Sequence, residues 1–236
     1  MVETRAGRRR WGRGSAPALL LALALAAPVP AEPAPEAPRH LVYLHGRIVQ
    51  EEQSARPRHP RYGVYELEAI REAFRRRGFV VHGEIRPRGA TVEEAADRVV
   101  AEVRGLLSGG VPADRILVAG ASMGGAIALL AAARLGLPEL RVATLGTCLA
   151  STLEYLEGDG VGAPVGPLLS IREASDELTE PCPPWQAPGP GGSPVVRELL
   201  LDTGLAHGFL YRPLPEWVEP VAAWAEGEGD GIGDTR

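Results

Sequence analysis

The residue best placed for chemistry is a serine at the centre of a glycine-rich corner, GASMGGA. Ser122 has Gly120 two residues before it and Gly124 two residues after it. This G-x-S-x-G spacing is typical of a sharp strand-to-helix turn that presents a nucleophile, since a Cβ at either glycine would clash with a neighbouring element. The turn would also put the backbone amide of Met123 at a helix N-terminus, where it can donate to an oxyanion. The corner therefore predicts acyl transfer through Ser122.

Two other interpretations fit a glycine-rich corner: a structural turn, and a dinucleotide-binding corner like that of NAD(P)-dependent short-chain dehydrogenases. A dinucleotide corner belongs on the first strand of its domain, whereas this one follows the third predicted strand. The last glycine of the pattern is replaced by Ala126, and the chain has no lysine for the tyrosine–lysine pair of those enzymes. We therefore favour hydrolysis, and we assign no metal site.

A nucleophilic serine needs a base. In α/β-hydrolases, which have a G-x-S-x-G corner like this one, the chain order is serine, acid, histidine, and of five histidines only His207 follows Ser122. His207 lies in DTGLAHGFLY, directly after a predicted strand. We expect it to be the general base.

The orienting acid should lie between the serine and the histidine, after another strand. The stretch LLSIREASDELTE offers Asp176, with Glu173, Glu177 and Glu180 as competitors. Asp176 is preferred because it lies at the usual reach from the last core position of the strand, Ile171. Glu173 is the next choice.

A second oxyanion donor is expected from the loop after the first strand of the domain. There the sequence is LVYLHGRIV, so the backbone amide of Arg47 would face the site, and Gly46 would let the chain come close. His45 precedes the serine and would break the order as a base. We expect it to be a buried histidine bonded to nearby loop backbone.

The elements that must position these residues alternate along the chain. Near-continuous apolar runs are typical of parallel strands covered on both faces. They occupy Leu41–Leu44, Phe79–Ile85, Ile116–Ala119, Val142–Leu145, Leu168–Ile171 and Glu198–Leu201. Helical patterns occupy Tyr65–Arg77, Val92–Leu107 with Thr91 as N-cap, Ala126–Leu135 and Trp217–Ala225. The alternation predicts a doubly wound α/β fold of about six mostly parallel strands, whose sites lie at the carboxyl ends of the strands.

Together, YLHGR, GASMGG, SIREASDE and AHGFLY resemble the small secreted bacterial α/β-hydrolases related to dienelactone hydrolase and carboxylesterases, over about residues 40–225. The resemblance implies a triad of Ser122, Asp176 and His207, an oxyanion hole of the Arg47 and Met123 amides, and no cofactor. The chain departs from the pattern in having Glu173 where many members have glycine. It also lacks the usual N-terminal antiparallel hairpin.

The resemblance implies a serine esterase acting on a small ester. No lid domain fits between Gly146 and Pro167, so we expect an open site. In the long loop RIVQEEQSARPRHPRYG, His59, Arg61 and Tyr62 could contact substrate, although a solvated loop is the preferred interpretation. The alternative function is a binding protein that keeps the fold without the chemistry.

The N-terminal segment has the composition of a secretory signal. Five arginines precede an apolar stretch, Ala16–Ala27, that is too short to span a bilayer. We divide the chain into a signal peptide (1–31), an Ala/Pro/Glu tether (32–38), the hydrolase domain (39–225) and a flexible acidic tail (226–236). Removing residues 1–31 changes the formal net charge from −5 to −9, which argues against nucleic acid as a partner. We expect an exported protein without a stable membrane anchor.

The two cysteines, Cys148 and Cys182, each follow a predicted strand of the same sheet. An exported chain meets an oxidising compartment, where an even number of cysteines indicates a bridge. Because both residues lie at the carboxyl edge, the sequence predicts a disulfide that tethers the segment bearing Asp176.

Overall fold

The computed structural model describes residues 37–150, 152, 154, 164–182 and 196–227, together with Met1. The signal segment after Met1, most of the tether and tail, and the middle of the Gly146–Pro167 connection lie outside the described residues. No helix among the described residues is long and apolar enough to cross a membrane.

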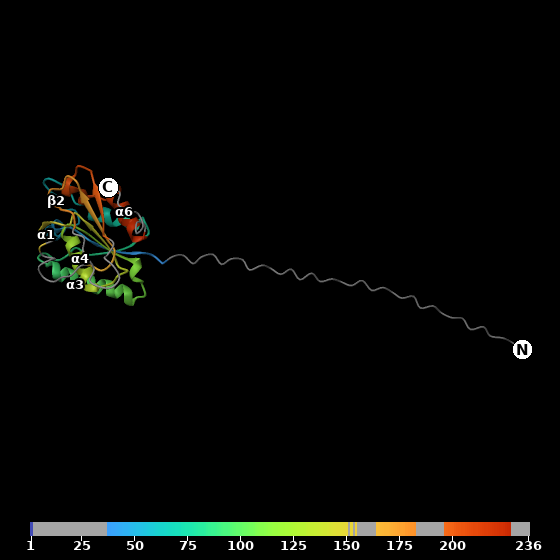
Figure 1. The fold of residues 1–236 in the computed structure, drawn as a ribbon. Coiled ribbons are helices and arrows are strands. Elements are labelled where there is room, and N and C mark those ends of the chain that lie inside the picture. The colour runs from blue at the N-terminus through green and yellow to red at the C-terminus, as the bar shows by residue number, and fades with distance from the viewer. Residues whose placement is uncertain (2–36, 151, 153, 155–163, 183–195, 228–236) are drawn as a thin grey trace. The chain divides into compact units, whose positions relative to one another are not determined.

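A six-stranded, all-parallel sheet forms the centre of the described domain (Figure 1). Its order is β4-β1-β5-β6-β7-β8. The strands are β1 His40–Leu44, β4 Val80–His82, β5 Ile116–Ala121, β6 Arg141–Leu145, β7 Leu168–Glu173 and β8 Val196–Leu201. The predicted doubly wound fold and its six strands are confirmed.

Helices cover both faces of this sheet. They are α1 Arg47–Glu52, α2 Leu67–Arg75, α3 Val92–Ser108, α4 Met123–Leu135 and α6 Pro215–Ala225. Side chains of β1 alternate between two cores: Leu41 and Tyr43 pack with α2 and α6, while Val42 and Leu44 pack with α3 and α4. In Figure 1, α3 and α4 lie together on one side of the sheet and α6 on the other.

The sheet has its topological switch between β1 and β5, which are neighbours although β4 lies between them in the chain. From that point the chain continues outward to β4 on one side and to β6, β7 and β8 on the other. Ligands in sheets of this type bind in the crevice at the carboxyl ends beside the switch. In the register of the pair, Leu44 lies opposite Gly120, so the HGR loop and the serine corner end up side by side.

Several boundaries differ from the sequence prediction. The strand predicted for Phe79–Ile85 ends at His82 because Gly83 adopts a φ of +124° and lies against the carbonyl of Tyr43. The helix expected from Ala126 begins three residues earlier, at Met123, directly after the serine. The helix predicted for Tyr65–Arg77 is shorter at both ends. The N-cap at Thr91 is confirmed, since its hydroxyl accepts from the Glu94 amide in a capping box.

Some elements of the described chain were not predicted. The loop after β1 forms the short helix α1 and then a small antiparallel hairpin, β2 Arg58–His59 with β3 Gly63–Val64. The turn η2, Ala206–Tyr211, holds the AHGFLY stretch.

Candidate active site

Ser122 occupies a strained turn between β5 and α4. Its φ of 54° and ψ of −122° are unusual for a residue with a Cβ, and conformations of this kind cost about 1–3 kcal/mol. The turn is fixed by the Ser122 amide, which donates to the carbonyl of Leu145 at 2.8 Å. A serine before a helix normally caps it with its hydroxyl, but Ser122 makes no such side-chain cap. Its hydroxyl is therefore available to the cleft.

The glycines around Ser122 allow three elements to approach one another. A Cβ on Gly120 would overlap the carbonyl of Gly124 in α4, and a Cβ on Gly124 would overlap the carbonyl of Leu44 at the end of β1. Gly125 is similarly closed off by the side chain of Thr147. Both elbow glycines thus lie where the motif requires them, and they let α4 pack directly against the sheet.

Asp176 and His207 come together from the loops after β7 and β8. The Nδ1 atom of His207 lies 2.7 Å from Oδ2 of Asp176, and both residues are buried. The other carboxylate oxygen, Oδ1, accepts the amide of Leu178 at 3.2 Å. An ionised aspartate can only accept, so His207 donates from Nδ1 and its Nε2 carries the free lone pair.

Ser122 and His207 line the same cleft. Within the described residues, the serine hydroxyl makes no hydrogen bond with the imidazole. Catalytic hydrogen bonds are often long before substrate binds. The geometry thus brings Asp176 and His207 into direct contact and places Ser122 on the same cleft wall.

Glu173, the second-choice acid, makes no hydrogen bond with His207 among the described residues. Its carboxylate is fully buried and accepts hydrogen bonds from the amide and hydroxyl of Ser175 and from the amides of Thr203 and Gly204. Ser175 in turn accepts the amide of Ala206, next to the histidine. Glu173 therefore joins the Asp176 loop to the His207 loop.

The two expected oxyanion donors begin the helices on either side of Ser122. Met123 is the first residue of α4, and Arg47 is the first residue of α1. The first amides of a helix have no acceptor within it. A Cβ built on Gly46 would lie only 3.8 Å from the Cβ of Ser122, so the loop that carries the Arg47 amide contacts the serine corner.

His45 is fully buried, as expected for a histidine bonded to loop backbone. Its Nδ1 lies 2.8 Å from the Gly46 carbonyl, and its Nε2 lies 3.1 Å from the Arg86 amide. Burial, followed by the charge of Arg86, lowers the pKa of His45 from 6.5 to about 3. His45 is therefore neutral at physiological pH.

The cleft extends on both sides of Ser122. Four residues line both parts: Arg47, Ser122, Leu178 and His207. One part, of about 410 Å³, has an aromatic wall from the β2–β3 hairpin and the segments around it, made of His59, Tyr62, Tyr65 and Tyr211. We call it the aromatic half. The other part, of about 560 Å³, is lined by Val92, Met123, Ala126 and Leu149. We call it the aliphatic half.

The RIVQEEQSARPRHPRYG segment is more regular than the solvated loop preferred from the sequence. It contains α1 and the hairpin, and two of the three residues considered there, His59 and Tyr62, line the cleft. Their rings stack with centroids 4.5 Å apart, and Tyr62 packs against Tyr211 at 5.6 Å. Arg61 instead lies over the ring of Tyr62, 5.5 Å from its centroid. The tilted contact of Tyr62 and the edge-on contact of His59 with Tyr211 join the hairpin to η2.

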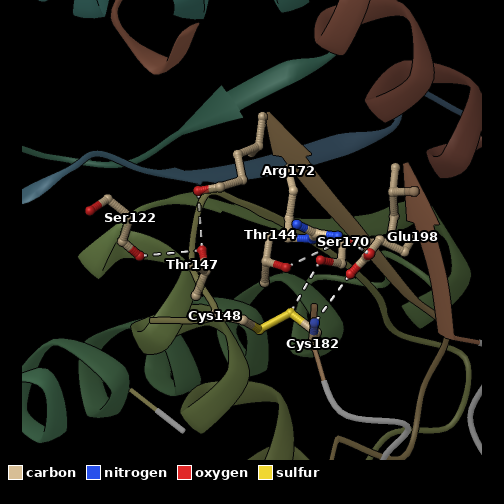
Figure 2. Close-up of a disulfide and its surroundings, with 10 residues drawn as sticks. Ser122, Thr144, Thr147, Cys148, Ser170, Arg172, Cys182 and Glu198 are labelled. Carbon is tan, nitrogen blue, oxygen red and sulfur yellow. Dashed lines mark hydrogen bonds and ion pairs between the residues drawn. A yellow bond between two sulfur atoms is a disulfide. The ribbon is translucent and has the colours of Figure 1, made fainter. Parts of the chain in front are cut away.

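The predicted disulfide joins Cys148 to Cys182 (Figure 2). Cys148 is one residue from Thr147, whose hydroxyl donates to the carbonyl of Ser122 at 3.3 Å. On the other side, the Glu180 amide donates to the Cys148 carbonyl at 2.8 Å. The bridge therefore ties the loop after β6 to the segment that follows Asp176.

Sequence reasoning missed Arg86, which is buried beside the HGR loop. Its stretch, EIRPRGA, contains proline and glycine and gives no sign of burial. The one usable signal is its position in the chain, since Arg86 follows a predicted strand and so lies at the carboxyl edge of the sheet, as the other site residues do. Among the described residues, no group of three or more histidine, cysteine or acidic side chains is arranged to hold a metal ion.

No protein-family model and no curated protein matches this sequence, but solved structures do. SOBER1 of Arabidopsis thaliana matches with a TM-score of 0.50 at 12% identity, covering 81% of this chain and 99% of that one. A proposed esterase from Staphylococcus aureus matches with a TM-score of 0.52 at 12% identity, covering 82% and 77%. The HSL-homolog EstE7 from a metagenome library matches with a TM-score of 0.52 at 15% identity, covering 80% and 78%. At this level of identity the likeness concerns the fold alone.

Proposed function

We propose that this protein is a serine hydrolase that cleaves small carboxylic esters through an acyl-enzyme. The observation that carries the proposal is the buried 2.7 Å contact between Asp176 and His207 in a cleft that Ser122 also lines. A buried histidine–carboxylate pair that shares a cleft with a serine on a strained turn has the groups that a serine–histidine–aspartate triad requires.

The proposed reaction follows from these groups. Nε2 of His207 takes the proton of the Ser122 hydroxyl as Oγ attacks the ester carbonyl, and Asp176 stabilises the imidazolium. The negative charge that develops on the carbonyl oxygen is stabilised by the amides of Arg47 and Met123, each worth about 3–4 kcal/mol where such donors have been removed. His207 then protonates the leaving alcohol. Water, deprotonated by His207, attacks the acyl-enzyme, the bond to Oγ breaks, and His207 returns the proton to Oγ as the acid is released.

The two halves of the cleft support an ester with an aromatic ring on one side of the scissile bond and an aliphatic chain on the other. In the aromatic half, the rings of Tyr62 and Tyr211 offer a stacking surface. Among the charged residues lining that half, Arg47 and Arg58 are balanced by Glu51 and Glu52. This balance favours an uncharged ring.

Export is part of the proposal. The basic N-terminal segment with its apolar stretch and the Cys148–Cys182 disulfide both fit an oxidising compartment.

A panel of p-nitrophenyl esters from acetate to octanoate, with aryl and alkyl acetates beside it, tests this function. We expect turnover by the wild type, none by Ser122→Ala, and a preference for aryl over alkyl acetates. Tyr62→Ala should reduce the aryl preference about 3–10-fold, while the matched variant Leu149→Ala should instead alter the preference for acyl chain length. Turnover by Ser122→Ala at the wild-type rate would refute the hydrolase.

A further inference from the structure

Arg86 is a buried cation whose side chain serves one loop. It lies in the segment after β4, only 4% exposed, and within the described chain it has no carboxylate partner. An isolated buried charge is expensive unless backbone or side-chain dipoles compensate it. Here hydrogen bonds to the HGR loop and to Gln50 of α1 supply the compensation at Nε and one terminal nitrogen, while the other terminal nitrogen has no hydrogen-bond partner among the described residues.

The contacts of Arg86 converge on that loop. One terminal nitrogen donates to the His45 carbonyl at 2.6 Å and, at 3.4 Å, to the Gly46 carbonyl. Nε donates to the side-chain oxygen of Gln50 in α1 at 2.8 Å. The backbone amide of Arg86 donates to Nε2 of His45 at 3.1 Å. The planar guanidinium makes the three side-chain contacts together from two different nitrogens, which the single nitrogen of an ammonium group cannot do.

The same contacts determine the tautomer of His45. Because Nε2 accepts the Arg86 amide, it carries no proton, so in the neutral ring the proton is on Nδ1. Nδ1 therefore donates to the Gly46 carbonyl, 2.8 Å away. The Gly46 carbonyl thus receives two donors, one from His45 and one from Arg86.

This carbonyl belongs to the peptide unit that also contains the Arg47 amide. A trans peptide is planar, with its C=O and N–H pointing in opposite directions, so holding the carbonyl on the Arg86 side turns the N–H to the other side. On that side Arg47 and Ser122 line the cleft together. Donors on a carbonyl also polarise its peptide and strengthen the N–H as a donor, by about 10–30% per bond.

We propose that Arg86 and His45 are positioning residues that fix and polarise the Gly46–Arg47 peptide so that its N–H acts on the oxyanion. The proposal rests on the proposed function, because the oxyanion forms only in acyl transfer. The two residues contact no substrate and act through the backbone amide of Arg47.

A purely structural role for Arg86 would lower stability without a selective effect on the transition state, so the test needs a matched control. Arg71 provides one: it is also buried, and its hydrogen bonds go to the carbonyl of Gly83 and to Glu68 rather than to the HGR loop. We would compare Arg86→Gln with Arg71→Gln at a temperature where circular dichroism shows both to be folded. The readouts are kcat, KM and the inhibition constant of a phenylboronic acid, which forms a tetrahedral adduct with the serine.

We expect Arg86→Gln to lower kcat about 10–100-fold, less than the 10²–10³-fold seen when an oxyanion donor is removed outright. KM should change less than threefold, and boronate binding should weaken by the same factor as kcat. Arg71→Gln should leave kcat and boronate binding within about twofold of wild type, whatever its stability. Equal kcat and boronate binding in Arg86→Gln and Arg71→Gln would overturn the proposal.

Conservative variants give the answer even if Arg86→Gln does not fold. His45→Asn keeps a donor for the Gly46 carbonyl and should retain more kcat and boronate affinity than His45→Ala, and Arg86→Lys should lie between wild type and Arg86→Gln. If His45→Asn is no better than His45→Ala, and Arg86→Lys matches wild type, the proposal fails. A wild type that hydrolyses no ester and binds no boronate would instead refute the proposed function.

Discussion

Two buried charges of opposite sign hold the two sides of the cleft. On the β1 side, Arg86 donates to the carbonyls of the loop that carries the Arg47 amide. On the β7–β8 side, Glu173 accepts the amides of the loops that carry Asp176 and His207. Each side chain is fixed to backbone rather than to the reacting groups.

The difference lies in what each charge aligns. A cation orients carbonyls and so turns the amides on the opposite side of the peptides toward the cleft, where negative charge develops. An anion orients amides and so fixes two loops whose side chains, Asp176 and His207, must meet. Preorganisation of both kinds costs no rearrangement during the reaction. The comparison teaches that a buried cation suits a loop that must present a backbone amide to the cleft, and a buried anion suits loops whose side chains must be held together.

The largest effect is expected on the Glu173 side, where proton transfer depends on Asp176. Asp176→Asn would leave His207 without its orienting acceptor, and we expect kcat to fall about 10⁴-fold, as when the equivalent partner is lost in other triads. Steady-state kinetics with a p-nitrophenyl ester would measure it. A loss of less than tenfold would show that another group orients His207, and Glu173→Gln would then be the variant to examine.

The disulfide strengthens only the Glu173 side. The bridge closes a loop with a sequence separation of 34 residues, for which the chain-entropy model gives about 3–4 kcal/mol of stability. We expect the double variant Cys148→Ser/Cys182→Ser to lose that much free energy of unfolding in urea titrations. Mass spectrometry of the exported protein should find no alkylatable thiol before reduction. Two free thiols there would contradict both the bridge and the proposed export.

A smaller effect is expected when Glu173 itself loses its charge. Glu173→Gln replaces one accepting oxygen by a donor that faces other donors, which should lower the free energy of unfolding by about 1–3 kcal/mol. Because both the Asp176 and the His207 loop are bonded to Glu173, kcat should fall with KM nearly unchanged. Glu177→Gln, on the same loop, is the control and should leave both quantities at wild-type values. If kcat and the free energy of unfolding change equally in Glu173→Gln and Glu177→Gln, Glu173 does not hold the two loops in place.

On the Arg86 side, the free energy of unfolding should depend on pH through His45. The pKa of His45 is lowered from 6.5 to about 3 in the folded protein, so the unfolded chain binds a proton that the folded chain rejects. This contribution to stability is complete above pH 6.5 and is lost at about 1.4 kcal/mol per pH unit as the pH falls from 6.5 toward 3. Urea titrations at pH 7 and pH 5 should show wild type losing about 2 kcal/mol more than His45→Asn. Equal losses would mean that His45 takes up a proton without penalty.

The sequence predicted the parts of the site that local physics determines. Buried strands appear as apolar runs, and glycines at 120 and 124 are required wherever a serine corner must pass between a strand and a helix. The order of serine, acid and histidine then pointed to Asp176 and His207, which lie together in the structure.

What the sequence could not predict depends on contacts between distant segments. Arg86 is 41 positions from His45, and nothing in a Pro- and Gly-containing loop distinguishes a buried arginine from a solvated one. The hairpin that bears His59 and Tyr62 likewise contacts Tyr211, about 150 positions further along the chain, through an edge-on and a tilted ring contact. Short strands of two residues have no periodicity to detect.

The central claim is that Ser122 is the nucleophile that His207 activates, and covalent labelling tests it most directly. A fluorophosphonate probe, followed by peptide mass spectrometry, should modify the wild type at Ser122 and nowhere else. Ser122→Ala should remain unlabelled, and His207→Ala should label far more slowly while keeping its circular dichroism spectrum. Labelling at another residue, or undiminished labelling of Ser122→Ala, would contradict the account.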